Sequence, residues 1–296
     1  MYASVIVCTY NRADRLKNGI ISIENQTYPK DMYEIIIVND GSMDNTMEII
    51  DEFIRIYSNI KFVNLIENHG VCYAANSGFE VSKGEYILFT DDDCIVTPDW
   101  IERMLSHLST HPVVVGQIRS SDHNYLALAD NISGFHPLMK MDKPGITTIL
   151  AGGNMALQRE VFISSGGFKP GYKIMDMELG VRLLEAGRTF YYAPDVIVTH
   201  YPERANIRET MAHYASYSFY TIQLRNQYQK VLNTPLILRS SILLLVLSPF
   251  IALGETVQIF SSNRYLLRYL HTAPAIYLLK LAWCWGAFKG LRSIGK

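Results

Sequence analysis

The sequence predicts an α/β protein with a mostly parallel sheet flanked by helices, followed by a hydrophobic helical segment. Four short apolar runs, Ala3 to Cys8, Glu34 to Val38, Ile60 to Ile66 and Glu85 to Thr90, alternate with predicted helices. Strands that are apolar along their whole length are buried on both faces, which is typical of a parallel sheet covered by helices. From Leu236 onward the mixture of charged and apolar residues gives way to long apolar runs.

The remaining elements follow from periodicity, capping residues and glycines. The polar, Gly/Pro-punctuated stretch from Ser120 to Thr147 is predicted to be largely a loop, and a long loop in a compact domain is usually functional. Helices are predicted over Arg12–Glu24, Met47–Tyr57, Val71–Val81, Glu160–Ser165 and Met177–Ala186, and further strands over Thr148–Leu157, Arg188–Ala193 and Asp195–Thr199.

Two apolar runs dominate the C-terminal segment. Ser241 to Leu253 has no charge, and Ala273 to Phe288 has one, Lys280. Neither run reaches the roughly 18–20 uninterrupted apolar residues of a clear membrane span. We therefore expect the segment to lie in a membrane interface or to form a shallow hairpin. The alternative is a pair of buried helices packed against one another.

Charge and cysteine content exclude some classes of protein. The 296 residues have a net charge of −1, and no basic excess indicates a nucleic-acid partner. The four cysteines, Cys8, Cys72, Cys94 and Cys284, show neither CxxC pairing nor metal-ligand spacing, so we expect buried thiols in a reducing compartment. The apolar run that begins at Ala3 leaves no room for a signal peptide, so the active part is expected in the cytoplasm.

Polar clusters follow the predicted strands at the edge where ligands bind in parallel sheets. Asp91, Asp92 and Asp93 come directly after the fourth strand. If the strand stays extended, Asp91 and Asp93 share one side and Asp92 points to the other. Two convergent carboxylates suit Mg²⁺ or Mn²⁺, which would bridge a diphosphate. The alternative is a solvated acidic turn that caps the next helix.

The first two strands end in residues suited to a nucleotide. Thr9, Tyr10, Asn11 and Arg12 form the first strand-to-helix crossing, where backbone N–H groups and polar side chains can contact phosphates. Helix capping by Thr9 or Asn11 is the alternative. Asp40 could accept a hydrogen bond from a uracil ring or a ribose hydroxyl, and an Asx-turn is equally compatible with Asp40-Gly41.

The second half of the chain offers a candidate general base. Asp176 and Glu178 lie at the start of a predicted helix, where either could accept the proton of an acceptor hydroxyl. Carboxylates in a first turn also stabilise the helix dipole, which is the structural alternative. His200 follows a strand and is either a metal ligand from the far side of the site or a structural histidine.

Taken in order, TYNR, VNDGS-x-D-x-T, FTDDD, GGNMAL, GGF and D-x-E-L-x-x-RL-x-x-AG resemble the motifs of family 2 glycosyltransferases with the Rossmann-like GT-A fold. The resemblance covers roughly Ala3 to His200. It implies a domain over 1–230, with a nucleotide-binding half at 1–120 and an acceptor half at 121–230, and a hydrophobic tail at 231–296. No Arg-Trp pair of the processive synthases occurs, which implies a single-transfer enzyme.

The resemblance also implies residue roles. The nucleotide would contact Thr9, Tyr10, Arg12, Asp40, Asn76 and Asp91, the donor sugar Asp92, Gly152, Gly153 and Asn154, and the metal Asp91, Asp93 and His200. Asp176 matches the family's base, although the acidic residue that usually precedes the base is Met175 here, so Glu178 is a second candidate.

The expected reaction is inverting, metal-dependent transfer from a nucleotide-diphosphate sugar, with UDP-sugars favoured. The acceptor would be a saccharide or lipid-linked hydroxyl in polysaccharide or glycolipid synthesis, at the inner face of the cell membrane. Two alternatives remain. A sugar-phosphate nucleotidyltransferase would need a glycine-rich basic loop after the first strand, which Thr9 to Arg15 does not provide. A non-catalytic GT-A binding protein would not need the filled aspartate positions.

Overall fold

The computed structural model describes residues 1–296 except 122–123, 140–142, 203–205 and 295–296. The chain divides into two compact units. Unit 1 comprises Met1–Arg119 and Asp142–His200, and unit 2 comprises Ser120–Met141 and Tyr201–Lys296. Each is described below by itself.

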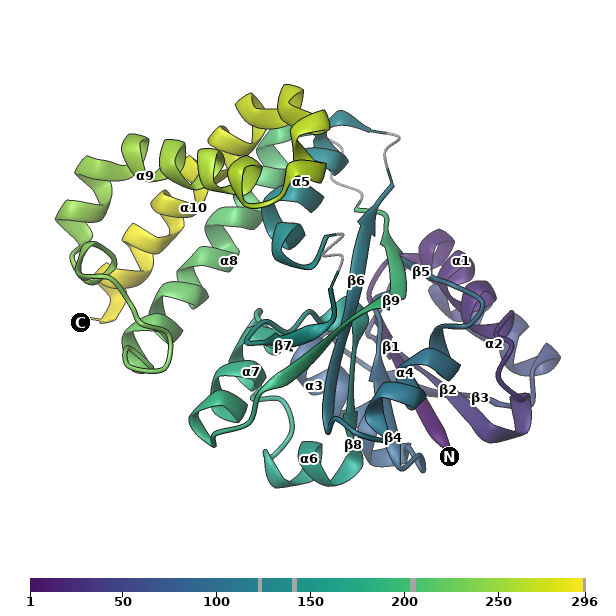
Figure 1. Ribbon diagram of the computed structural model, residues 1–296. Helices are drawn as coiled ribbons and strands as arrows, with labels where there is room; N and C mark the ends of the chain where they lie inside the picture. Colours follow the sequence, from purple (N-terminus) through teal and green to yellow (C-terminus); the bar gives the residue numbers. More distant parts are fainter. Residues whose placement is uncertain (122–123, 140–142, 203–205, 295–296) are drawn as a thin grey trace. The chain divides into compact units, whose positions relative to one another are not determined.

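Unit 1 is built on one sheet in the order β3-β2-β1-β4-β8-β6-β9-β5, with β7 paired to β9 (Figure 1). The first four strands are β1 (Ala3–Thr9), β2 (Tyr33–Asp40), β3 (Ile60–Leu65) and β4 (Tyr86–Phe89). They pair in parallel, with Ala3 beside both Tyr33 and Tyr86. Every residue of β2 is buried, as its unbroken apolar run predicted.

The rest of the sheet pairs differently. It comprises β5 (Cys94–Val96), β6 (Val113–Ser120), β7 (Gly145–Thr147), β8 (Met155–Gln158) and β9 (Phe190–His200). The pairs β4–β8, β6–β8, β5–β9 and β7–β9 are antiparallel. The α/β class is confirmed, with parallel pairing among the first four strands and antiparallel pairing in these four further pairs. The two strands predicted on either side of Pro194 form the single strand β9, because proline is tolerated where its missing N–H leaves the ladder intact.

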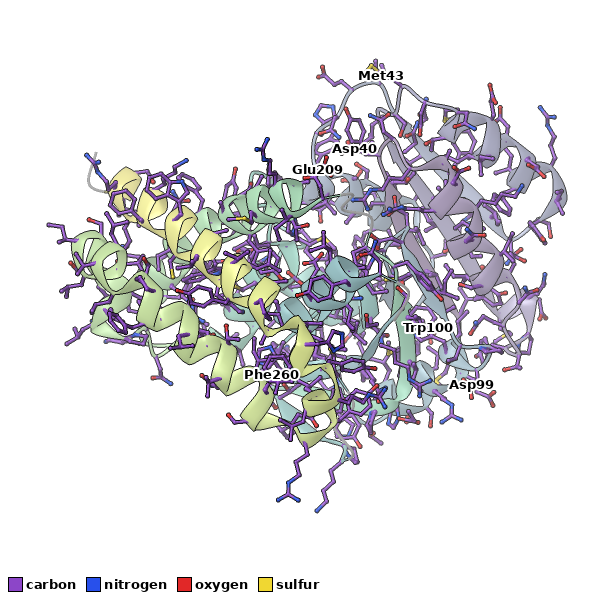
Figure 2. The ribbon with its side chains drawn as sticks, turned by 90° about the horizontal axis from the view of Figure 1, so that it is seen from above. Asp40, Met43, Asp99, Trp100, Glu209 and Phe260 are labelled. Atoms are coloured by element: carbon purple, nitrogen blue, oxygen red, sulfur yellow. The ribbon has the colours of Figure 1, made fainter. Side chains whose placement is uncertain are left out.

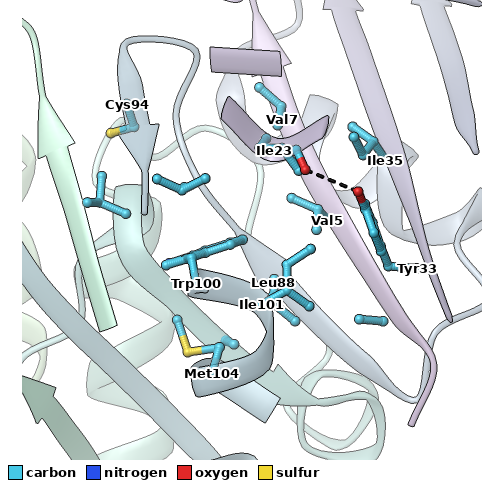
Figure 3. Packing of buried hydrophobic residues seen from close by; sticks show 14 of the residues in the cluster. Val5, Val7, Ile23, Tyr33, Ile35, Leu88, Cys94, Trp100, Ile101 and Met104 are labelled. Atoms are coloured by element: carbon cyan, nitrogen blue, oxygen red, sulfur yellow. Dashed lines mark hydrogen bonds between the residues drawn. The ribbon is translucent and has the colours of Figure 1, made fainter. Parts of the chain in front are cut away.

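Helices cover both faces of the parallel strands. Side chains alternate along a strand, so Val5 and Val7 face one side and Ile6 the other. The helices α1 (Ala13–Glu24), α2 (Thr46–Ile56) and α4 (Trp100–Leu108) pack on the Val5 side in one buried cluster. Figure 3 shows α4 residues Trp100, Ile101 and Met104 next to Leu88 and Val5.

The opposite face is covered by α3 (Val71–Val81), through a glycine. A Cβ on Gly78 would lie 2.8 Å from the Cγ2 atoms of both Ile6 and Val38, so only glycine allows this close approach. Phe79, Phe89, Phe162 and Phe168 form an aromatic cluster on the same side, with ring centroids 4.6–5.5 Å apart. Two further helices of unit 1 are α6 (Arg159–Ser164) and α7 (Met175–Glu185).

Unit 2 is helical. Its helices are α5 (Tyr125–Phe135), α8 (Ile207–Gln227), α9 (Ser241–Ser262) and α10 (Ala273–Ile294). The prediction that 120–147 is largely loop was wrong, because α5 occupies its middle. The Asn124 side chain caps α5 by accepting from the amides of Leu126 and Ala127. Leu128 and Ile132 then pack against residues from α9 and α10, which local sequence cannot reveal.

The two apolar runs of the tail form α9 and α10. Among the described residues, α9 is the single helix whose length and composition would suffice to cross a membrane. Helices α8 and α10 approach closely at Gly286 and Gly290, where a Cβ would overlap backbone atoms of Ala215 and Phe219. Small residues four apart allow such close packing of two helices. Short 3₁₀ turns occur at Lys30–Met32, His136–Leu138, Gly152–Asn154, Leu236–Arg239 and Arg264–Thr272.

Candidate functional site

The three aspartates lie in a turn rather than at the end of an extended strand. Strand β4 ends at Phe89, and β5 begins at Cys94, whose N–H donates to the carbonyl of Asp91 (3.1 Å). Carboxylate oxygens of Asp91 and Asp93 and the thiol of Cys94 lie within 4.8 Å of one another. Asp92 accepts from Arg12 Nη1 at 2.9 Å, and the same nitrogen lies 3.3 Å from Asp93 Oδ2, so Asp92 and Asp93 share one guanidinium.

Crowding of these carboxylates separates their pKa values. Burial, together with the charge of Asp93, raises the pKa of Asp91 to about 7. Burial also opposes ionisation of Asp93, but His200, Arg12 and Arg15 outweigh it and lower the pKa of Asp93 to about 2. The two groups form a coupled pair in which Asp93 holds the negative charge. A cation between them would relieve the repulsion.

Three cationic or potentially cationic groups surround Asp93. Arg12 Nη1 lies 3.3 Å and Arg15 Nη1 3.4 Å from Asp93 Oδ2, and His200 Nε2 lies 3.4 Å from Oδ1. Burial alone would lower the pKa of His200, but the carboxylates of Asp93 and Asp91 raise it. The cluster therefore brings positive charge to the place where a diphosphate would add negative charge.

His200 reaches the site through strand register. It is the last residue of β9, which pairs antiparallel with β5 so that Cys94 lies opposite His200. The register places an imidazole beside a carboxylate 107 positions earlier in the chain. The position of His200 agrees with its candidate role as a ligand from the far side.

The donor set fits a hard divalent cation. Two carboxylates and one imidazole are ligands that Mn²⁺ and Mg²⁺ sites accept. Cys94 adds little to such a set, because Mg²⁺ and Mn²⁺ prefer oxygen ligands to a thiol.

Gly152 and Gly153 connect the aspartate pair to the candidate base. A Cβ on Gly153 would lie 2.9 Å from Asp91 Oδ2, and the Gly153 carbonyl accepts from Thr90 Oγ1 at 3.0 Å. The N–H of Gly152 donates to Asp176 Oδ2 at 3.1 Å. Adjacent residues of one segment thus lie beside Asp91 and Asp176, which are 85 positions apart in the sequence.

Asp176 and Glu178 have different surroundings. Asp176 is partly exposed and accepts from the amides of Gly152 and Met177, while burial raises its pKa. Glu178 is 1% exposed and pairs with Arg182 through two contacts of 2.7 Å, Oε1 to Nε and Oε2 to Nη2. Arg182 also donates to the carbonyls of Ser165 and Gly167. Glu178 is thus part of a buried ion pair that secures the 165–167 loop.

Asp40 holds a neighbouring loop. It is buried at the end of β2, and its two carboxylate oxygens accept from the amides of His69 (2.8 Å) and Gly70 (2.9 Å). Figure 2 labels Asp40 and Met43 in this region of unit 1. The amide of Met43 donates to Asn11 Oδ1 at 2.7 Å, so the ends of β1 and β2 are tied together.

The other candidate residues divide into exposed and buried ones. Tyr10 is 40% exposed at the end of β1, whereas Thr9 is buried. The side-chain amide of Asn76 makes two hydrogen bonds to the backbone of Phe168: it donates to the carbonyl (2.7 Å) and accepts from the N–H (3.0 Å). Asn154 is fully buried and bonds to Trp100 Nε1 (2.8 Å) and to the carbonyls of Gln117 and Val196 (2.9 and 3.1 Å). The side chains of Asn76 and Asn154 therefore fasten loops of the site.

Sequence reasoning missed three residues that shape the site. Arg15 contacts Asp93, Arg182 neutralises Glu178, and Trp100 anchors Asn154. The spacing of Arg12 and Arg15 places them on neighbouring positions of one helix face, and Glu178 and Arg182 are an i, i+4 pair. These spacings were available signals. The Trp100 contact has no local signature.

Comparison with protein families gives two matches. A model described as glycosyl transferase family 2 matches residues 4–166, and one described as glycosyl transferase family group 2 matches residues 86–287. Among curated relatives, Glycosyltransferase AglE of Haloferax volcanii is 30% identical over 203 residues, 67% of this chain and 66% of the relative. Glucosyl-dolichyl phosphate glucuronosyltransferase of the same organism is 28% identical over 178 residues, 57% and 56% of the two chains. The chain spans about two thirds or less of the length of these relatives.

Two solved structures share the fold. The mannosyltransferase PcManGT of Pyrobaculum calidifontis, in complex with GDP-Man and Mn²⁺, superposes with a TM-score of 0.66 at 21% identity, covering 95% of this chain and 85% of that one. GalNAc-T7 with UDP, GalNAc and Mn²⁺ has a TM-score of 0.57 at 18% identity, covering 79% and 52%. With the family model matching more than half of the residues, this chain belongs to glycosyl transferase family 2 and has the GT-A fold.

Proposed function

We propose that this protein transfers a sugar from a nucleotide-diphosphate donor to a hydroxyl acceptor, once per binding event, with inversion and with a divalent metal. One observation carries the proposal. In the Gly152–Gly153 segment, the N–H of Gly152 donates to Asp176 Oδ2 at 3.1 Å, and a Cβ on the adjacent Gly153 would lie 2.9 Å from Asp91 Oδ2. A donor sugar held above this segment would have its leaving group at the aspartate pair and its acceptor at Asp176.

The donor's charged end belongs at the aspartate pair. Asp91, Asp93 and His200 would hold Mn²⁺ or Mg²⁺, which when bound supplies positive charge to offset that of the leaving diphosphate. Arg12 and Arg15 already lie 3.3–3.4 Å from Asp93 and would shift part of their contacts to the diphosphate. The nucleoside would occupy the edge formed by Thr9, Tyr10 and the loop that Asp40 secures.

The acceptor's proton belongs to Asp176. In a single displacement the acceptor oxygen attacks from the face opposite the leaving group and becomes acidic as the new bond forms. Asp176 is partly exposed, and burial raises its pKa toward the range of a useful general base. Glu178 already has its two oxygens on Arg182, which favours Asp176 over Glu178.

The proposal also names a donor class and an acceptor class. The nucleoside is proposed to be uridine, although one similar structure holds GDP-Man and the other UDP. The acceptor is proposed to be a saccharide or a lipid-linked sugar, in polysaccharide or glycolipid synthesis at the cytoplasmic face of the cell membrane. A similar curated protein carries a dolichyl-phosphate substrate in its name, and the apolar α9 supports a membrane site.

A nucleotide panel tests the first half of the reaction. UDP, GDP and dTDP are titrated with Mn²⁺ while the unfolding temperature is followed, because a ligand that binds the native state raises it. We expect one nucleotide to stabilise the protein, EDTA to remove the effect, and Asp93→Asn to abolish it. Glu52→Gln, at an exposed position of α2, is the matched control and should respond as the wild type does. No metal-dependent response to any nucleotide would contradict the proposal.

The stereochemistry tests the second half. The matching donor is incubated with saccharide and lipid-linked acceptors, and proton NMR of the new anomeric centre gives the configuration. Inversion relative to the donor supports single displacement by the acceptor oxygen, with Asp176 as the base that takes its proton. Retention would refute it, and binding without any turnover would favour a non-catalytic binding protein.

A further inference from the structure

Helix α9 carries apolar residues on its outer face as well as on its inner one. Its buried residues include Leu244, Ile259 and Phe260, which pack against the other helices of unit 2. At roughly 100° per residue, six of its exposed apolar residues fall within an arc of about 100°, and Leu245, which is also exposed, lies outside that arc. This α9 stripe consists of Ile242 (72% exposed), Leu243 (49%), Val246 (65%), Phe250 (71%), Leu253 (54%) and Val257 (58%).

The stripe does not match the surface of a helix that faces water. Such a helix shows charged or polar residues opposite its buried side. In α9 the outer arc is aliphatic and aromatic over four turns, and the helix has one charged residue, Glu255. A contiguous exposed apolar surface of this kind marks a binding site for a protein or a membrane.

The distribution of charge favours a membrane. The tail at 231–296 has seven Lys or Arg residues and one Glu, a net charge of +6, so with −1 for the whole chain the first 230 residues carry −7. A two-fold contact between two copies would bring the same basic tail against itself. An anionic bilayer attracts it, by about 1 kcal/mol for each Lys or Arg near the surface.

Exposed cations lie at both ends of the α9 stripe. Arg239 precedes α9, and Arg264 and Arg268 follow it in the next turn. Helix α10 adds Trp285, which is 48% exposed, with Lys289 Nζ 5.1 Å from the centre of its ring. Tryptophan beside a basic residue is typical of the boundary between lipid and water.

The inner face of α9 argues that the helix lies on the bilayer rather than crossing it. Ile259 and Phe260 share a buried cluster with Leu128 and Ile132 of α5. If α9 crossed the bilayer, it would lose these contacts, or α10 would have to enter the bilayer with it. Helix α10 carries Lys280, whose ammonium donates to the Ser133 carbonyl. Lying flat buries the outer arc and leaves the bundle intact.

We propose that the α9 stripe docks unit 2 flat on an anionic lipid bilayer, with its six side chains in the interface and Arg239, Arg264 and Arg268 at the headgroup phosphates. This deepens the proposed function by naming the surface on which a lipid-linked acceptor would be met. Donor binding at the aspartate site is a separate property of unit 1, so either proposal can fail alone.

Vesicle sedimentation of the full-length protein tests the docking. Vesicles of phosphatidylcholine alone are compared with vesicles that also contain phosphatidylglycerol. Val246→Ser/Phe250→Ser should weaken binding to the mixed vesicles by about tenfold or more for each side chain. The control Ile56→Ser/Ile163→Ser removes two apolar residues of unit 1 with similar exposure, 61% and 58%, and should bind as the wild type does.

Several outcomes would overturn the proposal. Unchanged vesicle binding by the stripe variant removes the role of α9, and equal binding without phosphatidylglycerol removes the role of charge. If sedimentation velocity shows a wild-type dimer that the stripe variant loses, the occupant is a second copy. Both double variants must keep the wild-type helix content by circular dichroism and the wild-type unfolding temperature, which shows that they are folded.

Depth distinguishes lying from crossing. Position 250 is near the middle of α9, so Phe250→Trp would report from the bilayer centre in a spanning helix and from the interface in a flat one. Lipids with quenchers attached at shallow and deep positions are compared, with wild type as the background for the native tryptophans. Stronger quenching by the shallow probe is expected, and stronger quenching by the deep probe would overturn the flat orientation.

Discussion

Substitutions of Glu178 and Asp176 should have opposite effects, one on stability and one on catalysis. In Glu178→Gln, the buried Arg182 loses the negative charge that it contacts twice at 2.7 Å. Breaking a buried ion pair by removing one partner costs about 3–5 kcal/mol. We expect a loss of about 3 kcal/mol in the free energy of unfolding, at the low end of that range. Arg182 keeps its hydrogen bonds to the carbonyls of Ser165 and Gly167, and the oxygen of the new amide can still accept one from it.

Asp176→Asn should leave the stability nearly unchanged and lower the turnover. Burial disfavours the ionised form of the Asp176 carboxyl. Its oxygens accept from two backbone N–H groups, and the amide oxygen of asparagine can still accept from one of them. We expect its free energy of unfolding to change by less than ~1 kcal/mol. Turnover should fall by about 10²–10⁴, the usual contribution of general-base catalysis, with donor affinity unchanged.

Both quantities are measured on the same samples, by urea unfolding and by steady-state transfer. Glu185→Gln, at the exposed end of the same helix, controls for the change of Glu to Gln and should match wild type in both assays. The reasoning is refuted if Glu178→Gln retains wild-type stability but loses turnover while Asp176→Asn stays active. The base would then be Glu178.

Three further substitutions follow from close contacts. Asn154→Ala leaves the indole N–H of Trp100 and two carbonyls without partners, so urea unfolding should show a loss of about 3–5 kcal/mol; a loss under ~1 kcal/mol would mean that water replaces the amide. Gly153→Ala pushes a methyl group toward the metal-type carboxylates and should weaken Mn²⁺-dependent nucleotide binding, measured by calorimetry, by about tenfold or more. Gly286→Leu should separate α8 from α10 and increase proteolysis of unit 2, whereas Gly254→Leu, which has open space, should not; equal sensitivity would argue against close helix packing.

Local pattern carried much of the fold. Unbroken apolar runs predicted β1, β2 and β4, because strands buried on both faces have no polar alternation to obscure them. Strand β3 was also predicted, although Lys61 and Asn64 interrupt its apolar residues and Phe62 is exposed. The helix over Val71–Val81 has the predicted limits. The antiparallel pairing of β8 with β4 and of β9 with β5 was not predicted, because the direction of a strand depends on which partner the chain meets after a long connection.

Helix α5 shows where local pattern stops. Its residues are surrounded by glycine, proline and polar positions. Its stability depends on the packing of Leu128 and Ile132 with α9, α10 and the 3₁₀ turn Arg264–Thr272, more than 120 residues away. A short helix with little propensity of its own forms when tertiary contacts bury its apolar face. No local window of sequence contains that partner.

The sequence by itself determined which residues could carry the chemistry, because residue type and position at strand ends limit the choice. It identified Asp91, Asp93, Asp176 and His200 as candidates, but it left Asp176 and Glu178 open as bases and Asp40 open between two roles. Only the tertiary structure placed Glu178 on Arg182, Asp40 on the amides of His69 and Gly70, and Asp176 beside the segment that lies next to Asp91. A carboxylate's role depends on which donors reach it, and these donors come from loops that only the folded chain brings together.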